Sequence, residues 1–305
     1  MPQITNRHRI WIEQAGTRIA VARWGEAASG KPPALLVHGT GFVGEVWDEV
    51  ASALASRYTV YAVDRRGHGA SHKPATSAYH FLDFALDLQT VIEDLGLSDI
   101  FGVSHSAGAT DLLLAAKLLP GRFSRLFAME PTVMDPRRER ASGARLSDKG
   151  MSVVQGVLRR QVEFENADVA FARFRAAPAF ADWSEHALAS YIQHGFHALP
   201  DGRVRLLCVP EIESAMLLPI FEAIEQVYAG DERGNPFEWL TEIDCPVRVA
   251  TAERSWPIYK DMVSRAIAMI PIVSQWTFDG VGHCAGQEAP ALLLRALEVF
   301  EAEAG

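Results

Sequence analysis

The chain has 305 residues and a formal net charge of −9 at pH 7, with 49% hydrophobic and 22% charged residues. That composition is ordinary for a globular protein with a large core. The acidic balance argues against nucleic acid as a partner, because phosphate binding needs clustered cations. No apolar run approaches the length of a membrane span, and the first nine residues lack the apolar centre of a signal peptide. We therefore expect a cytoplasmic protein with no membrane partner.

The three cysteines support the same compartment. Cys208, Cys245 and Cys284 are odd in number and far apart in the chain. This spacing predicts free thiols in a reducing environment and matches no metal-binding motif.

The first half of the chain alternates between strand and helix signals. Two runs at 9–13 and 17–24 predict a hairpin around a glycine turn. Short apolar runs, each ending in polar or glycine residues, predict parallel strands that are buried on both faces; they lie at 34–37, 58–63, 101–104 and 126–129. Apolar residues at helical spacing over 81–95 predict a helix between the second and third of these runs.

The alternation stops at about residue 133 and resumes near residue 246. The intervening stretch is amphipathic at 162–175, 185–194 and 211–228 and carries no strong signal for a parallel strand. Strands are then predicted at 246–250 and 273–278, and helices at 261–269 and 289–300. We therefore predict an α/β core formed by residues 1–133 and 244–305, with residues 134–243 inserted as a helical cap over the carboxyl ends of the strands.

The pentapeptide Ser-His-Ser-Ala-Gly at 104–108 is the strongest functional motif. A reactive serine on a sharp strand-to-helix turn needs small residues two places before and after it. Ser104 and Ser106 both satisfy this spacing, but the helical pattern begins at about Ala107. We therefore predict Ser106 as the nucleophile and Ser104 as a residue inside the sheet.

Three further motifs follow predicted strands and join the pentapeptide in the candidate site. The His-Gly-Thr-Gly loop at 38–41 lets the backbone approach an oxyanion, so Thr40 and Ala107 are predicted to donate N–H groups to it. His283 follows the last strand, where the general base belongs in the chain order serine, acid, histidine. The third motif, Asp-Arg-Arg-Gly-His-Gly-Ala-Ser at 64–71, follows the strand at 58–63. Its charged residues are expected to hold this loop together and to take no part in the reaction.

These four motifs, in this order and spacing, resemble the α/β-hydrolase fold superfamily, in its cap-bearing branch, over nearly the whole chain. The resemblance implies a mostly parallel eight-stranded sheet flanked by helices, with a helical cap inserted after the sixth strand. It also implies an acid after the seventh strand, where many members have aspartate and this chain has Ser255. Glu130, at the end of the sixth strand, and Glu253 are the two substitutes, and we favour Glu130.

The constellation predicts a serine hydrolase that cleaves a carboxylic ester, or a related acyl compound such as a lactone or thioester, through an acyl-enzyme on Ser106. Serine at this position argues against epoxide hydrolysis and carbon–halogen cleavage, which need a carboxylate nucleophile in this fold. Hydrolysis of a carbon–carbon bond in a dienol-type substrate, and a non-catalytic binding protein on the same fold, remain alternatives.

The expected partner is a small-molecule substrate. The predicted acyl transfer needs no metal or organic cofactor, and the sequence has no dinucleotide-binding fingerprint. The sequence does not determine the oligomeric state, and a homodimer is one of the possibilities. Arginines of the predicted cap could meet an anionic substrate, although solvated helix faces are the favoured interpretation of the whole set; they are Arg137, Arg138, Arg140, Arg159, Arg160, Arg173 and Arg175.

Overall fold

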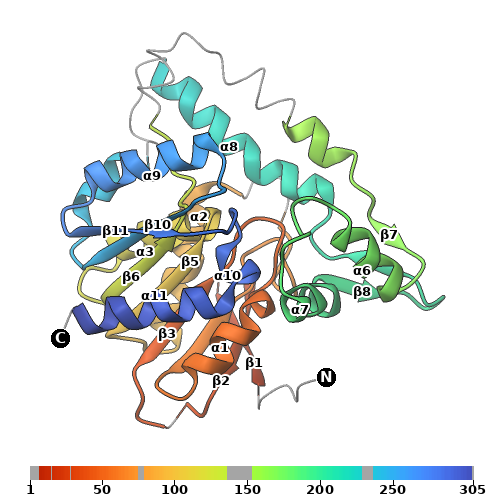
Figure 1. The fold of residues 1–305 in the computed structure, drawn as a ribbon, viewed down its shortest axis with the longest axis horizontal. Helices are drawn as coiled ribbons and strands as arrows, with labels where there is room; N and C mark the ends of the chain where they lie inside the picture. Colours follow the sequence, from red (N-terminus) through yellow and green to blue (C-terminus); the bar gives the residue numbers. More distant parts are fainter. Residues whose placement is uncertain are drawn as a thin grey trace.

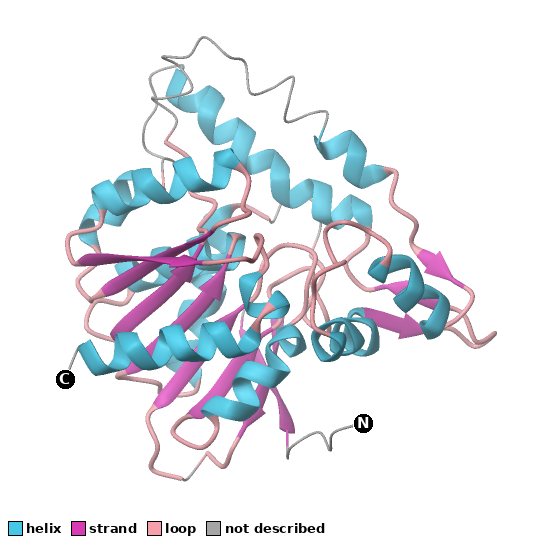
Figure 2. Ribbon diagram, in the orientation of Figure 1, coloured by secondary structure: helices cyan, strands magenta, loops and turns pink. Residues whose placement is uncertain are grey.

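A central sheet of eight strands organises the protein (Figures 1 and 2). The computed structural model describes residues 7–14, 16–27, 29–74, 79–135, 153–228 and 236–303. The strand order is β1-β2-β4-β3-β5-β6-β10-β11; β1 and β2 are antiparallel to their neighbours and the other pairs are parallel. The strands are β1 (Arg7–Gln14), β2 (Thr17–Trp24), β3 (Pro33–Val37), β4 (Thr59–Val63), β5 (Ile100–His105), β6 (Phe123–Met129), β10 (Val247–Ala252) and β11 (Val273–Phe278). This arrangement confirms the predicted fold class.

Helices cover both faces of this sheet because adjacent strand residues point to opposite sides. Leu36 packs in a cluster with residues of α1 (Asp48–Leu54) and α11 (Pro290–Glu303). Its neighbour Leu35 packs with α2 (Phe81–Asp94), α3 (Ala107–Leu118) and α9 (Pro257–Met269). Both leucines are fully buried, which is why β3 reads as a continuous apolar run and not as an alternating one.

The insertion between β6 and β10 contains helices and a second, small sheet. Residues 153–158 are helical, and the longer elements are α6 (Ala167–Arg175), α7 (Glu185–Gly195) and α8 (Pro210–Tyr228). Three antiparallel strands form the order β7-β9-β8; they are β7 (Glu163–Phe164), β8 (Phe196–Ala198) and β9 (Val204–Leu206). The sequence predicted only helices here, because strands of two or three residues are too short to show a period.

The insertion lies against loops at one end of the sheet (Figure 1, green to cyan). On α8, Met216 and Ile212 pack on Gly67, where an added Cβ would lie 2.4 Å and 2.8 Å from their side chains. On α7, the Ser190 hydroxyl donates to the main-chain oxygen of Glu45, and the His186 ring bonds the Asp48 carboxylate at 2.7 Å. These partners follow β3 and β4, so the insertion covers the carboxyl ends of the strands.

The structure does not define the first and last residues of the insertion. The short 3₁₀ helix η2 (Glu238–Glu242) contacts α3 and α9, and Phe237 and Leu240 pack in the core cluster. Residues 136–152 and 229–235 of the predicted cap lie outside the described residues. The domain boundaries at 133/134 and 243/244 therefore stay predictions.

Candidate active site

The turn between β5 and α3 has the geometry that a nucleophile elbow requires. Ser106 has φ 56° and ψ −126°, a conformation that non-glycine residues rarely adopt, and its N–H donates to the Met129 carbonyl at 2.8 Å. A Cβ on Gly108 would lie 2.3 Å from the His38 carbonyl oxygen, so only glycine fits there. Ser104, by contrast, is fully buried in β5. The strained, partly exposed serine at the turn is therefore Ser106.

The loop after β3 approaches this turn closely. A Cβ on Gly39 would lie 3.1 Å from Ser106 Cβ, so the backbone that leads into Thr40 passes directly beside the serine. Ala107 is the first residue of α3. Within the described residues, no hydrogen bond engages the main-chain N–H of Thr40 or Ala107. Both donors are thus available, and both belong to segments that flank Ser106.

Glu130 and His283 are directly hydrogen-bonded. The Nδ1 atom of His283 bonds Glu130 Oε2, which also accepts from the Ser255 hydroxyl at 2.7 Å. The other oxygen, Oε1, accepts from the Thr251 hydroxyl at 2.9 Å and from the Ala252 N–H at 3.0 Å. The carboxylate is 2% exposed, so all of its hydrogen bonds form in a buried setting.

This set of donors stabilises the charged carboxylate. Burial alone raises the pKa of Glu130, but the hydrogen bonds from His283, Ser255 and the Ala252 N–H outweigh it, and the net pKa lies below its ordinary value. Ser255, at the position where the resemblance implied an acid, donates a hydrogen bond to the carboxylate that comes from the neighbouring strand end.

Glu253 lies elsewhere. Its Oε2 accepts the Gly280 N–H at 2.7 Å, and its side chain is exposed in the turn after β10. Among the described contacts, none joins Glu253 to His283. Of the two substitutes predicted from the sequence, Glu130 is the carboxylate that contacts the histidine; the catalytic role of either stays a prediction.

Two other rings pack against the His283 ring. Tyr259, from the first turn of α9, stacks on it at 4.1 Å between ring centroids with an interplanar angle of 14°. His105 packs on it at 4.6 Å, and His105 Nε2 bonds the His283 carbonyl oxygen at 2.9 Å. His105 immediately precedes Ser106, so the elbow and the histidine loop are joined. The described hydrogen bonds do not include one between Ser106 and His283.

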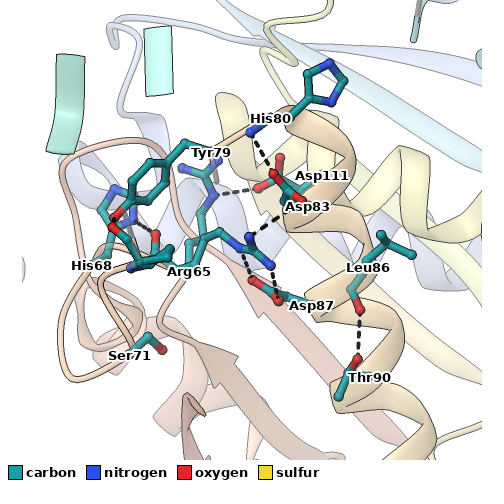
Figure 3. Close-up of polar contacts among 12 residues, drawn as sticks. Arg65, His68, Ser71, Tyr79, His80, Asp83, Leu86, Asp87, Thr90 and Asp111 are labelled. Atoms are coloured by element: carbon teal, nitrogen blue, oxygen red, sulfur yellow. Dashed lines mark hydrogen bonds and ion pairs between the residues drawn. The ribbon is translucent and has the colours of Figure 1, made fainter. Parts of the chain in front are cut away.

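Ion pairs and neutral histidines hold the surrounding loops (Figure 3). In the 64–71 loop, Arg65 pairs with Asp111 of α3, and Arg66 forms a two-pronged contact with Asp87 of α2 at 2.6 Å and 2.7 Å. His68 Nε2 accepts the Gly41 N–H at 2.9 Å. The two arginines of the loop thus bind carboxylates of the neighbouring helices α2 and α3.

His38 and His68 must both be uncharged to make these contacts. His38 Nε2 accepts the Arg65 N–H at 3.1 Å, while His38 Nδ1 bonds the Gly39 carbonyl at 2.7 Å. Burial and the Arg65 charge lower the pKa of His38 to about 3. Burial, with the Arg65 charge, also takes the pKa of His68 well below its ordinary value. Each ring therefore links the 38–41 loop to the 64–71 loop.

Three features of the described residues bear on metal binding, membrane insertion and disulfide formation. No group of three or more His, Cys, Asp or Glu side chains that could hold a metal ion occurs in the described ranges. Within the same ranges no helix has the length and apolar character needed to cross a bilayer. Cys208, Cys245 and Cys284 are free and buried.

Comparison with known proteins identifies the family. Residues 34–296 match the alpha/beta hydrolase family, a span that includes every motif described above. The chain therefore belongs to the alpha/beta hydrolase family.

Individual relatives match a smaller part of the chain than the family does. A non-heme chloroperoxidase of Kitasatospora aureofaciens is 36% identical over 104 residues, which is 34% of this chain and 36% of that protein. A 2-(acetamidomethylene)succinate hydrolase of Mesorhizobium japonicum is 36% identical over 107 residues, or 35% of this chain and 38% of that protein. These matches thus span less than half the length of either relative.

Solved structures extend the likeness to the whole fold. A crystal structure of E-2-(acetamidomethylene)succinate hydrolase superposes with a TM-score of 0.76 at 21% identity, covering 97% of this chain and all of that one. The thioesterase domain from the curacin biosynthetic pathway gives a TM-score of 0.75 at 22% identity, over 96% of this chain. At these identities the likeness establishes the shared fold.

Proposed function

We propose that the protein is a serine hydrolase that cleaves a carboxylic ester, or a related acyl compound such as a thioester, through an acyl-enzyme on Ser106. The observation that carries the proposal is the buried hydrogen bond between Glu130 and His283 Nδ1, next to a strained serine elbow. A carboxylate on Nδ1 fixes the tautomer in which Nε2 is the free base, and that tautomer can accept a serine proton.

The reaction follows from these positions. His283 takes the Ser106 proton as the hydroxyl attacks the acyl carbon, and Glu130 stabilises the imidazolium that forms. The N–H groups of Thr40 and Ala107 bind the developing oxyanion, each contributing about 3–4 kcal/mol. His283 then protonates the leaving group. Water, activated by the same imidazole, releases the acid from the acyl-enzyme and restores the serine.

The cap, taken as residues 134–243, is proposed to enclose a small-molecule substrate. Aromatic rings from the insertion reach the oxyanion loop: Phe42 packs edge-on against Trp183 at 4.9 Å and near Tyr191 at 5.9 Å. Phe42 also lies parallel to the His105 ring, 6.3 Å away. An apolar cover of this kind excludes water from the oxyanion, which strengthens its hydrogen bonds.

The test is turnover of 4-nitrophenyl and thioester substrates of graded acyl length by wild type, Ser106→Ala and Ser104→Ala. Wild type and Ser104→Ala should hydrolyse at least one substrate, and Ser106→Ala should be inactive with an unchanged circular dichroism spectrum. Full activity of Ser106→Ala would refute the proposal.

A further inference from the structure

One charged pair of the cap lies directly over the oxyanion loop. Glu213, on α8, accepts a hydrogen bond from Arg160 Nη1 at 2.5 Å through its Oε2 atom. The same oxygen lies 3.7 Å from the position that a Cβ on Gly41 would take. Gly41 follows Thr40, and Gly39 approaches Ser106 (see above). The Arg160 guanidinium therefore reaches the rim of the proposed active site.

The two members of the pair differ in exposure. The Glu213 side chain is 11% exposed, whereas the Arg160 side chain is 54% exposed. Burial raises the pKa of Glu213, and the Arg160 charge opposes that shift. The carboxylate is thus enclosed and already bound, while the cation still faces open space.

The unused hydrogen-bond donors of this pair also belong to Arg160. A guanidinium carries five N–H donors in a rigid fork that matches a carboxylate, and the contact with Glu213 uses one oxygen. The buried Glu213 fixes the orientation of the arginine without covering it. Arg175, another arginine of the insertion, is instead engaged in the fold: it donates to the main-chain carbonyls of Phe180, Ala181 and Trp183.

We propose that Arg160, held by Glu213, is a carboxylate-binding subsite that selects acyl substrates with a second, anionic end. This inference rests on the proposed acyl transfer at Ser106 and narrows its substrate class to monoesters or thioesters of short dicarboxylic acids. With a net charge of −9, the protein needs such a local cation to hold an anionic substrate.

The first experiment compares kcat/KM for three 4-nitrophenyl esters of equal acyl length, ending in a methyl, a carboxylate or a trimethylammonium group. The carboxylate ester should be preferred over the methyl ester by about 10- to 100-fold, the range for a charge-assisted hydrogen bond. Arg160→Gln should abolish that preference by lowering kcat/KM for the carboxylate ester to the value for the methyl ester. Arg159→Gln, the adjacent exposed arginine, is the matched control and should keep the preference.

A second experiment needs no turnover. Calorimetry should detect binding of glutarate to Ser106→Ala, no binding of butyrate at the same concentration, and loss of glutarate binding in the Ser106→Ala/Arg160→Gln variant. If no ester is hydrolysed but glutarate binds through Arg160, the proposed function fails and the subsite stands.

Three results would overturn the subsite. They are equal kcat/KM for the methyl and carboxylate esters together with no glutarate binding, an Arg160→Gln variant that keeps the preference, and a preference for the trimethylammonium ester. The last result would assign recognition to Glu213 as an anion.

Discussion

Replacing Glu130 with glutamine tests the most specific part of the proposed mechanism. The two carboxylate oxygens accept four hydrogen bonds and donate none. A glutamine amide of the same shape has one oxygen and one NH₂ group. In either orientation, therefore, the NH₂ group must face two groups that are donors in the native protein.

The two orientations have different consequences. If the NH₂ group faces His283, the ring must expose its Nδ1 lone pair, which places the proton on Nε2 and removes the base from Ser106. If the NH₂ group faces the Ala252 N–H, a buried donor is left unpaired, at about 1–3 kcal/mol of stability. By analogy with the equivalent change in other serine–histidine–acid enzymes, kcat should fall by ~10³–10⁴-fold, about 4–5 kcal/mol of transition-state stabilisation.

The assay is ester turnover, with urea unfolding to separate chemistry from stability. Glu253→Gln is the matched control, and it should keep kcat within about threefold because its carboxylate caps the Gly280 N–H in an exposed turn. A Glu130→Gln enzyme with near wild-type kcat, or an inactive Glu253→Gln enzyme, would refute the assignment of the acid.

Three further predictions concern the groups around the site. Gly108→Ala should destabilise by at least about 1–3 kcal/mol in urea unfolding, since its Cβ would collide with backbone oxygens, whereas Gly156→Ala, in open space, should not; equal midpoints would contradict the packing. Tyr259→Phe should keep kcat, and Tyr259→Leu should lower it by about 3- to 10-fold, because the ring that orients His283 is lost; a Leu variant with unchanged kcat would show that the stack is dispensable. The depressed pKa of His38, about 3 against 6.5 when unfolded, means that the unfolded chain binds the extra proton between these values. Its contribution to stability is therefore intact above about pH 6.5 and is lost as the pH falls toward 3. His38→Asn should flatten the dependence of the unfolding midpoint on pH in this window, and an unchanged slope would contradict the shift.

The core of the fold follows from local sequence signals. Runs such as residues 34–37 are apolar throughout because both faces of β3 are covered, and their alternation with helical spacing indicated a parallel sheet. The short elements gave no recognisable signal in the sequence. Strand β7 has two residues, and α10 (Ala285–Glu288) has a single turn, so neither can display a period.

The candidate site was predictable in its motifs and ambiguous in its acid. Ser106 could be separated from Ser104 because the helix start is visible in the sequence. Glu130 could not be separated from Glu253 by pattern alone, because the outcome depends on the positive φ of Glu130, 45°, and on the pairing of β6 with β10. The stacking of Tyr259 on His283 and the bond from Ser255 join residues far apart in the chain, and no local pattern encodes them.

The measurement that tests the account most directly is mass-spectrometric mapping of the protein after reaction with a fluorophosphonate. A single adduct on Ser106 is expected, with labelling abolished in Ser106→Ala, slowed by Glu130→Gln and retained in Ser104→Ala. An adduct on Ser104 or on any other residue, or an ester-hydrolysing protein that forms no adduct at all, would contradict the central claim that Ser106 is the nucleophile.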